Sequence, residues 1–204
     1  DPVNTLMEAY GGAARVTAIH NTPTLPYYEW YYDPLEEWLR DFELDVAGGF
    51  KPYDPSVPIR IAEEAEKRGH NVPSSEEEIR KIFGRGWWKY APEIAEELLL
   101  RNGFKRNSQG KWLTPKGDVW KLSVLTQVPE IWPLQARLGA SVAEKWRDFG
   151  IETTHEVNDN MAAITNMGEF DSSTTWPVES WGGHPDLYRW LQYMHSDYYK
   201  PIGE

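Results

Sequence analysis

Residues 119–157 alternate between short apolar runs and one amphipathic stretch, and this order constrains the fold more than any other feature of the chain. Residues 119–125 have apolar side chains among both the odd-numbered and the even-numbered positions, which is typical of a strand covered on both faces. Residues 134–149 repeat apolar residues at helical spacing and end at Gly150, and residues 150–157 resume a strand pattern. The expected apolar stripe of this helix comprises Leu134, Leu138, Val142 and Trp146, with Ala136, Ala140 and Ala143 between them. Strand, helix and strand in this order predict a right-handed crossover in a mixed or parallel sheet, and hence an α/β fold.

Signals for helix ends and turns surround this unit. Asp33 followed by Pro34 predicts a helix start, and its apolar stripe is expected to comprise Leu35, Trp38, Leu39 and Phe42. Ser74 and Ser75 both meet the Ser-x-x-Glu spacing of a capping box, which predicts a second helix start here.

Nearer the carboxyl end of the chain, three further elements are predicted. Residues 90–104 form a helix that closes on Gly103, and a polar hairpin follows at 110–117. A short helix is expected from Met161 to Met167, before a strand that runs from Gly168 toward Trp176.

The charge and the cysteine count exclude several classes of function. A formal charge of −11 leaves no basic stripe for nucleic acid and opposes binding to an anionic membrane surface. The chain has no cysteine, which removes disulfides and thiolate chemistry. The first residues lack the basic start and apolar core of a signal peptide, so either a signal peptide has been removed or the chain is a fragment. Because an initiating methionine is also absent, we expect a fragment.

Tryptophan is unusually abundant, with 11 residues among 204 and 11 tyrosines beside them. Trp38, Trp120, Trp146 and Trp190 lie in apolar phase and are expected in the core. The number of large rings exceeds what one core of this size needs, so some are expected to face a ligand.

The residues that connect the predicted helices and strands within residues 90–195 resemble those of a known family. Asn102-Gly-Phe104 closes a helix, Gly110 and Gly117 flank a hairpin, and Gly168-Glu-Phe-Asp171 starts a strand. In this order, and with Phe149-Gly-Ile151 between them, they resemble the C-terminal lobe of the family 5 extracellular solute-binding proteins of ABC importers. Tyr90-Ala-Pro92 departs from the family pattern, because the usual aspartate cap is missing.

The resemblance implies a fold, a location and partners. It implies one α/β lobe of a two-lobed periplasmic-binding-protein-like fold, a mixed sheet with helices on both faces. We expect residues 1–32 to be an extended or irregular leading segment, 33–195 the core of a single lobe, and 196–204 a truncated exit. The implied partners are an N-terminal lobe, an ABC permease and a captured solute, for a monomer at the periplasmic or extracellular cell surface without a cofactor.

The predicted ligand residues follow the last strand. Where peptide-binding relatives carry an aspartate that pairs with the peptide amino terminus, this chain has Glu179, and Ser180 replaces a tyrosine. Indole rings stack on the C–H faces of sugars, which favours a sugar ligand. The segment is most similar to the members of the family that bind β-linked gluco- or manno-oligosaccharides, so the resemblance implies such a ligand, with oligopeptides as the alternative. The expected binding residues are Trp176, Glu179, Trp181, Gly182, Gly183, His184, Trp132 and Trp87. For Trp87 and Trp132 the sequence leaves ligand contact and packing equally open.

Two other kinds of site were considered. A glycoside hydrolase would need paired carboxylates, for which Glu169, Asp171 and Glu179 are candidates by residue type alone. The five histidines are scattered without ligand spacing, so no metal site is predicted. We therefore expect a binding protein and not an enzyme.

Overall fold

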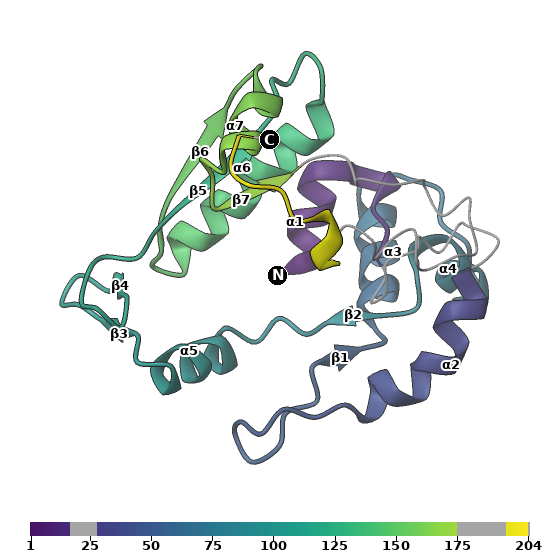
Figure 1. Ribbon diagram of the computed structural model, residues 1–204. Helices are drawn as coiled ribbons and strands as arrows, with labels where there is room; N and C mark the ends of the chain where they lie inside the picture. Colours follow the sequence, from purple (N-terminus) through teal and green to yellow (C-terminus); the bar gives the residue numbers. More distant parts are fainter. Residues whose placement is uncertain (17–27, 175–194, 204) are drawn as a thin grey trace. The chain divides into compact units, whose positions relative to one another are not determined.

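The computed structural model describes residues 1–16, 28–174 and 195–203, which form two compact units (Figure 1). The first comprises the described residues of 1–90 with 195–199, and the second those of 91–174 with 200–203. The units are described separately below. The expectation that both belong to a single lobe stays a prediction.

The first unit is mainly helical. Its elements are α1 (Pro2–Tyr10), η1 (Gly11–Ala13), α2 (Tyr28–Asp41), β1 (Tyr53–Asp54), α3 (Val57–Lys67), α4 (Glu76–Phe83), β2 (Trp87–Trp88) and η3 (Ser196–Tyr198). Strands β1 and β2 pair antiparallel. The main core joins α1, α3 and α4 through residues such as Met7, Ile61 and Phe83, each buried to 3% exposure or less. The capping box of α4 is confirmed, since Ser75 Oγ accepts the Glu78 N–H at 3.2 Å.

The leading residues correct one expectation. Residues 1–32 were predicted to be extended or irregular, but Pro2–Tyr10 forms α1 and Tyr28 already lies in α2. Asp1 caps α1 by accepting the Val3 N–H at 3.0 Å, and Pro2 occupies the first turn. This is the same Asp-Pro signal that the sequence offers at residues 33–34.

At Asp33-Pro34 that signal gave a wrong helix start, because α2 continues through Pro34. A proline inside a helix removes one backbone hydrogen bond and costs about 3 kcal/mol. Packing offsets this cost, because Tyr28 and Tyr32 are buried with their rings stacked 5.1 Å apart. The Tyr32 hydroxyl also hydrogen-bonds that of Tyr53, and burial raises the pKa of Tyr53 to about 12.

The buried face of α2 also differs from the prediction. Leu39 is buried as expected, but Trp38 is 56% exposed and Leu35 42% exposed. The face that packs is the one bearing Tyr28, Tyr32 and Leu39. The expected assignment of Trp38 to the core was therefore wrong. Its ring lies 5.0 Å from that of Phe42 on the exposed side of the helix.

The second unit is α/β. Its elements are α5 (Pro92–Arg101), β3 (Lys105–Arg106), β4 (Trp112–Leu113), β5 (Lys121–Thr126), α6 (Pro133–Asp148), β6 (Glu152–Val157), α7 (Met161–Met167) and β7 (Ser172–Thr174). Strands β3 and β4 form a hairpin that begins at Lys105, five residues before the predicted hairpin of 110–117. Gly103 has a φ of 84°, as the predicted turn after α5 requires.

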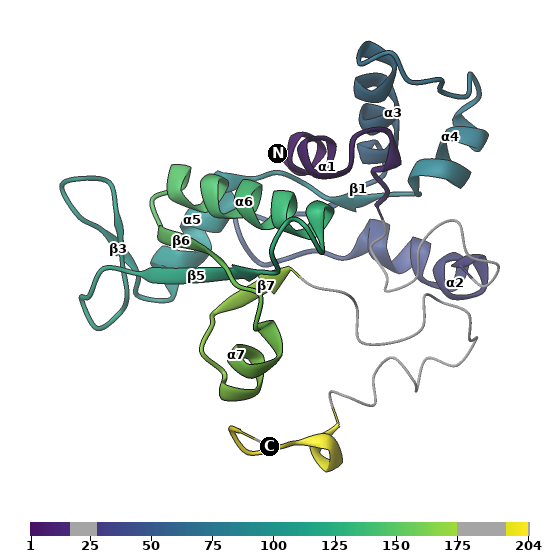
Figure 2. The same cartoon turned by 90° about the horizontal axis from the view of Figure 1, so that it is seen from above.

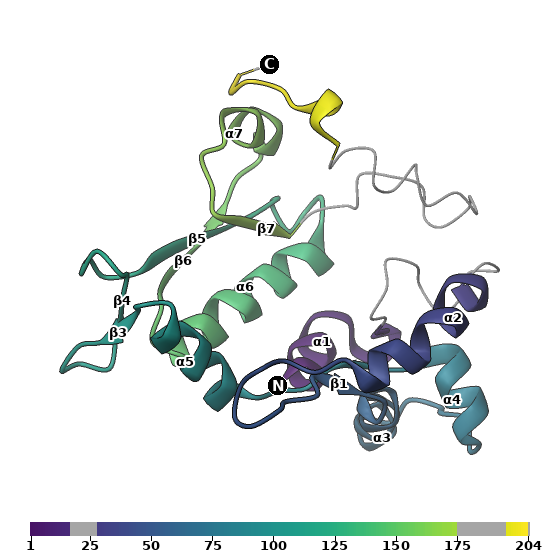
Figure 3. The same cartoon turned by 60° about the horizontal axis from the view of Figure 1, so that its bottom comes forward.

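The sheet of this unit is parallel, in the order β6-β5-β7. Strands β5 and β6 are joined by α6, as the sequence predicts, and α6 and α7 lie on opposite faces of the sheet (Figures 2 and 3). The α/β class is thus confirmed. Among the described residues, the antiparallel pairings occur in separate two-stranded sheets or as isolated bridges and not in one mixed sheet.

The buried residues of this unit are partly unexpected. Trp112 was assigned to a polar hairpin, yet it is completely buried, and its indole N–H donates to the Phe149 carbonyl at 2.9 Å. Trp120 and Trp146, expected in the core, are only half-buried. In α6 the buried residues are the small ones, Ala136, Gly139, Ser141 and Ala143. The expected stripe of Leu134, Leu138, Val142 and Trp146 lies at the margins, because small side chains let the helix approach the sheet more closely.

Candidate functional site

The carboxyl ends of β5, β6 and β7 meet at one edge of the parallel sheet. In open parallel sheets with helices packed on them, ligands bind outside this edge. The aligned pairs place Thr126 of β5 beside Val157 of β6 and Thr174 of β7. Figure 3 shows β7 and the start of α6 at the same end of the sheet. We define the carboxyl edge as residues 126–132, 157–160 and 174.

Thr126, the last residue of β5, stabilises this edge through its buried side chain. Its side chain is completely buried, and its Oγ1 lies 2.8 Å from Nε2 of His155. Burial, followed by the charge of Arg147, lowers the pKa of His155, so the neutral imidazole is the form that shares this hydrogen bond. The threonine and the histidine therefore join neighbouring strands beneath α6.

The loop after β5 is held in place by side chains at the edge. Gln127 accepts the Val128 N–H at 2.9 Å and reaches the Asp159 carbonyl at 3.4 Å. The Asn158 N–H donates to the Thr126 carbonyl at 2.9 Å. These bonds tie the loop after β5 to the loop after β6, and both loops carry amide groups that can hydrogen-bond a ligand.

Trp132 lies at the carboxyl edge, at the N-cap position of α6. Its backbone N–H donates to the Val128 carbonyl at 3.0 Å, and its side chain is half-buried. Pro133 starts the helix directly after it. The indole is thus attached to an ordered helix start, which limits how far it can move.

The start of β7 is fastened to β5 by Asp171. Its carboxylate accepts the Ser123 N–H at 2.7 Å and the Ser123 hydroxyl at 3.2 Å, and its own N–H donates to Ser123 Oγ at 3.1 Å. This carboxylate, considered from sequence as a catalytic candidate, is used to anchor a strand. Glu169 lies near it in the chain and is exposed.

The structure places only two of the eight residues predicted to bind ligand. Trp132 lies at the carboxyl edge. Trp87 lies in β2 of the first unit, partly buried against the core of α1, α3 and α4. The other six, Trp176, Glu179, Trp181, Gly182, Gly183 and His184, lie outside the described residues. Sequence reasoning missed Thr126, Gln127 and Asn158, although polar residues at the ends of predicted strands were a usable signal.

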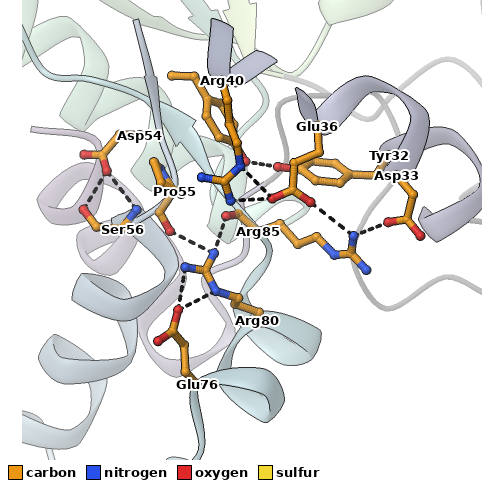
Figure 4. A network of polar contacts seen from close by, with 11 residues as sticks. Tyr32, Asp33, Glu36, Arg40, Asp54, Pro55, Ser56, Glu76, Arg80 and Arg85 are labelled. Atoms are coloured by element: carbon orange, nitrogen blue, oxygen red, sulfur yellow. Dashed lines mark hydrogen bonds and ion pairs between the residues drawn. The ribbon is translucent and has the colours of Figure 1, made fainter. Parts of the chain in front are cut away.

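The first unit contains a charged pocket of about 510 Å³ between α2, α4 and the segment after α4. Its lining comprises Glu29, Glu36, Glu76, Glu77, Arg40, Arg80, Lys81 and Arg85. Figure 4 shows how these charges pair: Arg80 binds Glu76 at 2.7 Å, and Arg40 binds Glu36 at 2.5 Å. Arg85 contacts three carboxylates of α2, those of Glu29, Asp33 and Glu36.

The pairs of Arg85 join the segment after α4 to α2, whereas the pairs of Arg80 and Arg40 each lie within one helix. The Arg80 guanidinium also donates to the carbonyls of Pro55 and Arg85, at 3.0 Å and 2.7 Å. A ligand of either charge would have to displace pairs already formed. We therefore assign the pocket a structural role.

The described residues offer neither a metal site nor a membrane-spanning helix. No cluster of three or more histidine or acidic side chains there has the arrangement of a metal site. Nor does any described helix combine the length and apolar character needed to cross a bilayer.

Comparison with known proteins found no matching family and no matching curated protein. Solved structures do show similarity. A periplasmic oligopeptide-binding protein of an ABC transporter from Thermotoga maritima, bound to mannohexaose, is 23% identical with a TM-score of 0.42, covering 60% of this chain. The oligopeptide-binding protein AppA from Bacillus subtilis, bound to a nonapeptide, is 21% identical with a TM-score of 0.40, and the match covers 49% of this chain.

NikZ from Campylobacter jejuni, in complex with Ni(L-His), gives 23% identity and a TM-score of 0.38 over 43% of this chain. The matched parts cover 23%, 20% and 17% of the Thermotoga, Bacillus and Campylobacter chains. The chain therefore spans less than a quarter of the length of each of these structures.

Proposed function

We propose that this chain is a ligand-binding part of a substrate-binding protein of an ABC importer, and that it captures β-linked oligosaccharides. The observation that carries the proposal is the carboxyl edge. There the loop after β5 presents Trp132, and β7 ends at Thr174, two residues before Trp176. The family resemblance of residues 90–195 supports the same assignment.

The chemistry of the edge suits a sugar. A half-buried indole offers an apolar face for the C–H groups of a pyranose ring. Amide side chains such as Gln127 and Asn158 can donate to and accept from hydroxyl groups. Trp176, Trp181 and His184 are proposed to complete the platform, with Gly182 and Gly183 allowing close backbone approach.

The mechanism is passive capture without bond cleavage. Ligand is held between aromatic faces while polar groups recognise hydroxyl positions, and closure against an N-terminal lobe excludes water. The loaded monomer then delivers its ligand to an ABC permease at the periplasmic or extracellular face of the membrane. An oligopeptide bound through Glu179 is the alternative occupant.

The test is a tryptophan-fluorescence titration of the 204-residue chain with mannohexaose, cellohexaose, a nonapeptide and Ni(L-His). Saturation by one of the sugars, weakened at least about 10-fold by Trp132→Ala, would support the proposal. Trp38→Ala is the matched control, because Trp38 is exposed on the first unit and should leave the affinity unchanged.

Each other result has a defined meaning. Saturation by the peptide, abolished by Glu179→Gln, would replace the sugar with the alternative ligand. Saturation by Ni(L-His) alone would refute both classes. Release of chromophore from a chromogenic β-glycoside would overturn the assignment as a binding protein and return Glu169, Asp171 and Glu179 to consideration as catalytic groups.

A further inference from the structure

Thr174, the last residue of β7, is bonded to the helix that carries Trp132. Its side-chain hydroxyl donates to the Gln135 carbonyl at 2.7 Å. Gln135 lies in the first turn of α6, three residues after Trp132. The bond therefore connects the end of β7 directly to the helix start that carries this indole.

The contact depends on how closely α6 approaches the sheet. A β-carbon placed on Gly139 would lie 2.2 Å from Cγ2 of Thr126 and 3.0 Å from Oγ1 of Thr174. Only glycine fits at this distance, because real β-carbons do not come within 3.0 Å of other heavy atoms. Because Gly139 has no side chain, α6 packs closer to the sheet, and the Thr174 hydroxyl can then reach the helix backbone.

The acceptor is also suitable for a second bond. A helical carbonyl normally accepts the N–H four residues later, and its second lone pair stays available. Gln135 and Gly139 are separated by four residues, so one carbonyl can serve both the helix and Thr174. The side chain of Thr174 is only part-buried, which leaves this bond near the surface of the carboxyl edge.

We propose that Thr174 is a positioning residue of the ligand site. Its hydroxyl sets the spacing between the end of β7 and the start of α6, and so the position of the Trp132 indole at the carboxyl edge. Thr174 itself touches no ligand in this scheme. The inference rests on the proposed function for its ligand, but the contact that carries it belongs to the described residues alone.

The experiment compares Thr174→Val, which keeps the shape and removes the hydroxyl, with the wild-type chain. Thr154→Val is the matched control, since Thr154 lies in β6 of the same sheet and its hydroxyl reaches the Leu122 carbonyl only at 3.5 Å. Each chain is labelled with 5-fluorotryptophan, and Trp132→Phe identifies the Trp132 fluorine resonance. Affinities for mannohexaose and cellohexaose, and the free energy of unfolding, are measured on the same samples.

We expect Thr174→Val to shift or broaden the Trp132 resonance and to weaken sugar binding by the folded protein about 5-fold, because the displaced indole would stack less well on the sugar ring. Thr154→Val should change neither. A second pair, Thr174→Ser and Thr174→Ala, differs only in the hydroxyl; serine should behave as the wild type and alanine as valine. If Thr174→Val fails to fold, the comparison of Thr174→Ser with Thr174→Ala still shows whether the hydroxyl positions Trp132.

A Trp132 resonance that is unchanged in Thr174→Val and Thr174→Ala would overturn the proposal. So would a loss of stability without any change in sugar affinity, because that result describes a purely structural bond. If the wild-type chain binds neither sugar, the proposed function fails, whereas the ligand-free resonance still decides whether Thr174 positions Trp132.

Discussion

Replacing Gly139 with alanine tests the close approach of α6 to the sheet. In an exposed helix position this change stabilises a protein by about 1 kcal/mol, because glycine is a poor helix former. Here the new methyl group would lie 2.2 Å from Thr126 Cγ2 and 3.4 Å from His155 Nε2. Overpacking of a buried site costs about 1–3 kcal/mol, and a contact this short belongs in the upper part of that range. We therefore expect Gly139→Ala to lower the free energy of unfolding by about 1–2 kcal/mol.

The assay is urea denaturation followed by circular dichroism and tryptophan fluorescence. Ala140→Gly provides the reference for helix propensity, because Ala140 is the exposed neighbour in the same helix and should lose about 1 kcal/mol. Thr126→Ser removes the methyl group that would clash while keeping the hydroxyl that meets His155. In the double variant the penalty of Gly139→Ala should fall by about 1 kcal/mol or more.

The reasoning has a clear refutation. If Gly139→Ala stabilised the chain by the amount that Ala140→Gly destabilises it, helix propensity alone would act at this position. The helix would then not lie against Thr126, and the contact between Thr174 and Gln135 would lose its explanation. A penalty that Thr126→Ser does not relieve would place the clash elsewhere.

Two further predictions concern a helix cap and a histidine. Ser75→Ala should lower the free energy of unfolding by about 1 kcal/mol through loss of the Glu78 N–H cap, and Ser74→Ala, one residue outside the cap, should leave chemical denaturation unchanged. For His155, burial lowers the folded-state pKa, so the unfolded chain binds the proton more readily and the stabilisation is complete above the unfolded pKa of about 6.5. The free energy of unfolding should therefore decrease as the pH falls through and below that value. His155→Gln should remove this part of the pH dependence, and His70→Gln should retain it. Equal slopes of unfolding free energy against pH in the wild type and both variants would contradict the assignment.

Much of the order of elements could be predicted because its signals are local. The Ser75 cap, the turn at Gly103 and the short helix of Met161–Met167 each depend on residues a few positions apart. The pairing of β5 with β6 could be inferred because a helix of suitable length separates two strand patterns. The same local signals misplaced the start of α2, since the burial of Tyr28 and Tyr32 outweighs a proline within the helix.

The candidate site was less accessible to sequence reasoning. For Trp132 and Trp87 the sequence left ligand contact and packing equally open; Trp132 lies at the carboxyl edge, while Trp87 packs against the core of the first unit. Thr126 and Gln127 were missed because their importance depends on which strands end beside one another. That arrangement comes from contacts between distant segments, such as the bond between Ser123 and Asp171, which are 48 positions apart.

The amino-acid sequence by itself determined the class of the fold, much of the order of its helices and strands from residue 75 on, and the absence of cysteine chemistry, because these depend on composition and short-range periodicity. Only the tertiary structure decided which face of each helix is buried. The periodicity of α6 favoured its large residues, yet Gly139 and its small neighbours face the sheet, because the backbone can approach closely only there. Trp112 is buried and Trp38 is exposed because the burial of a side chain depends on which distant residues pack against it.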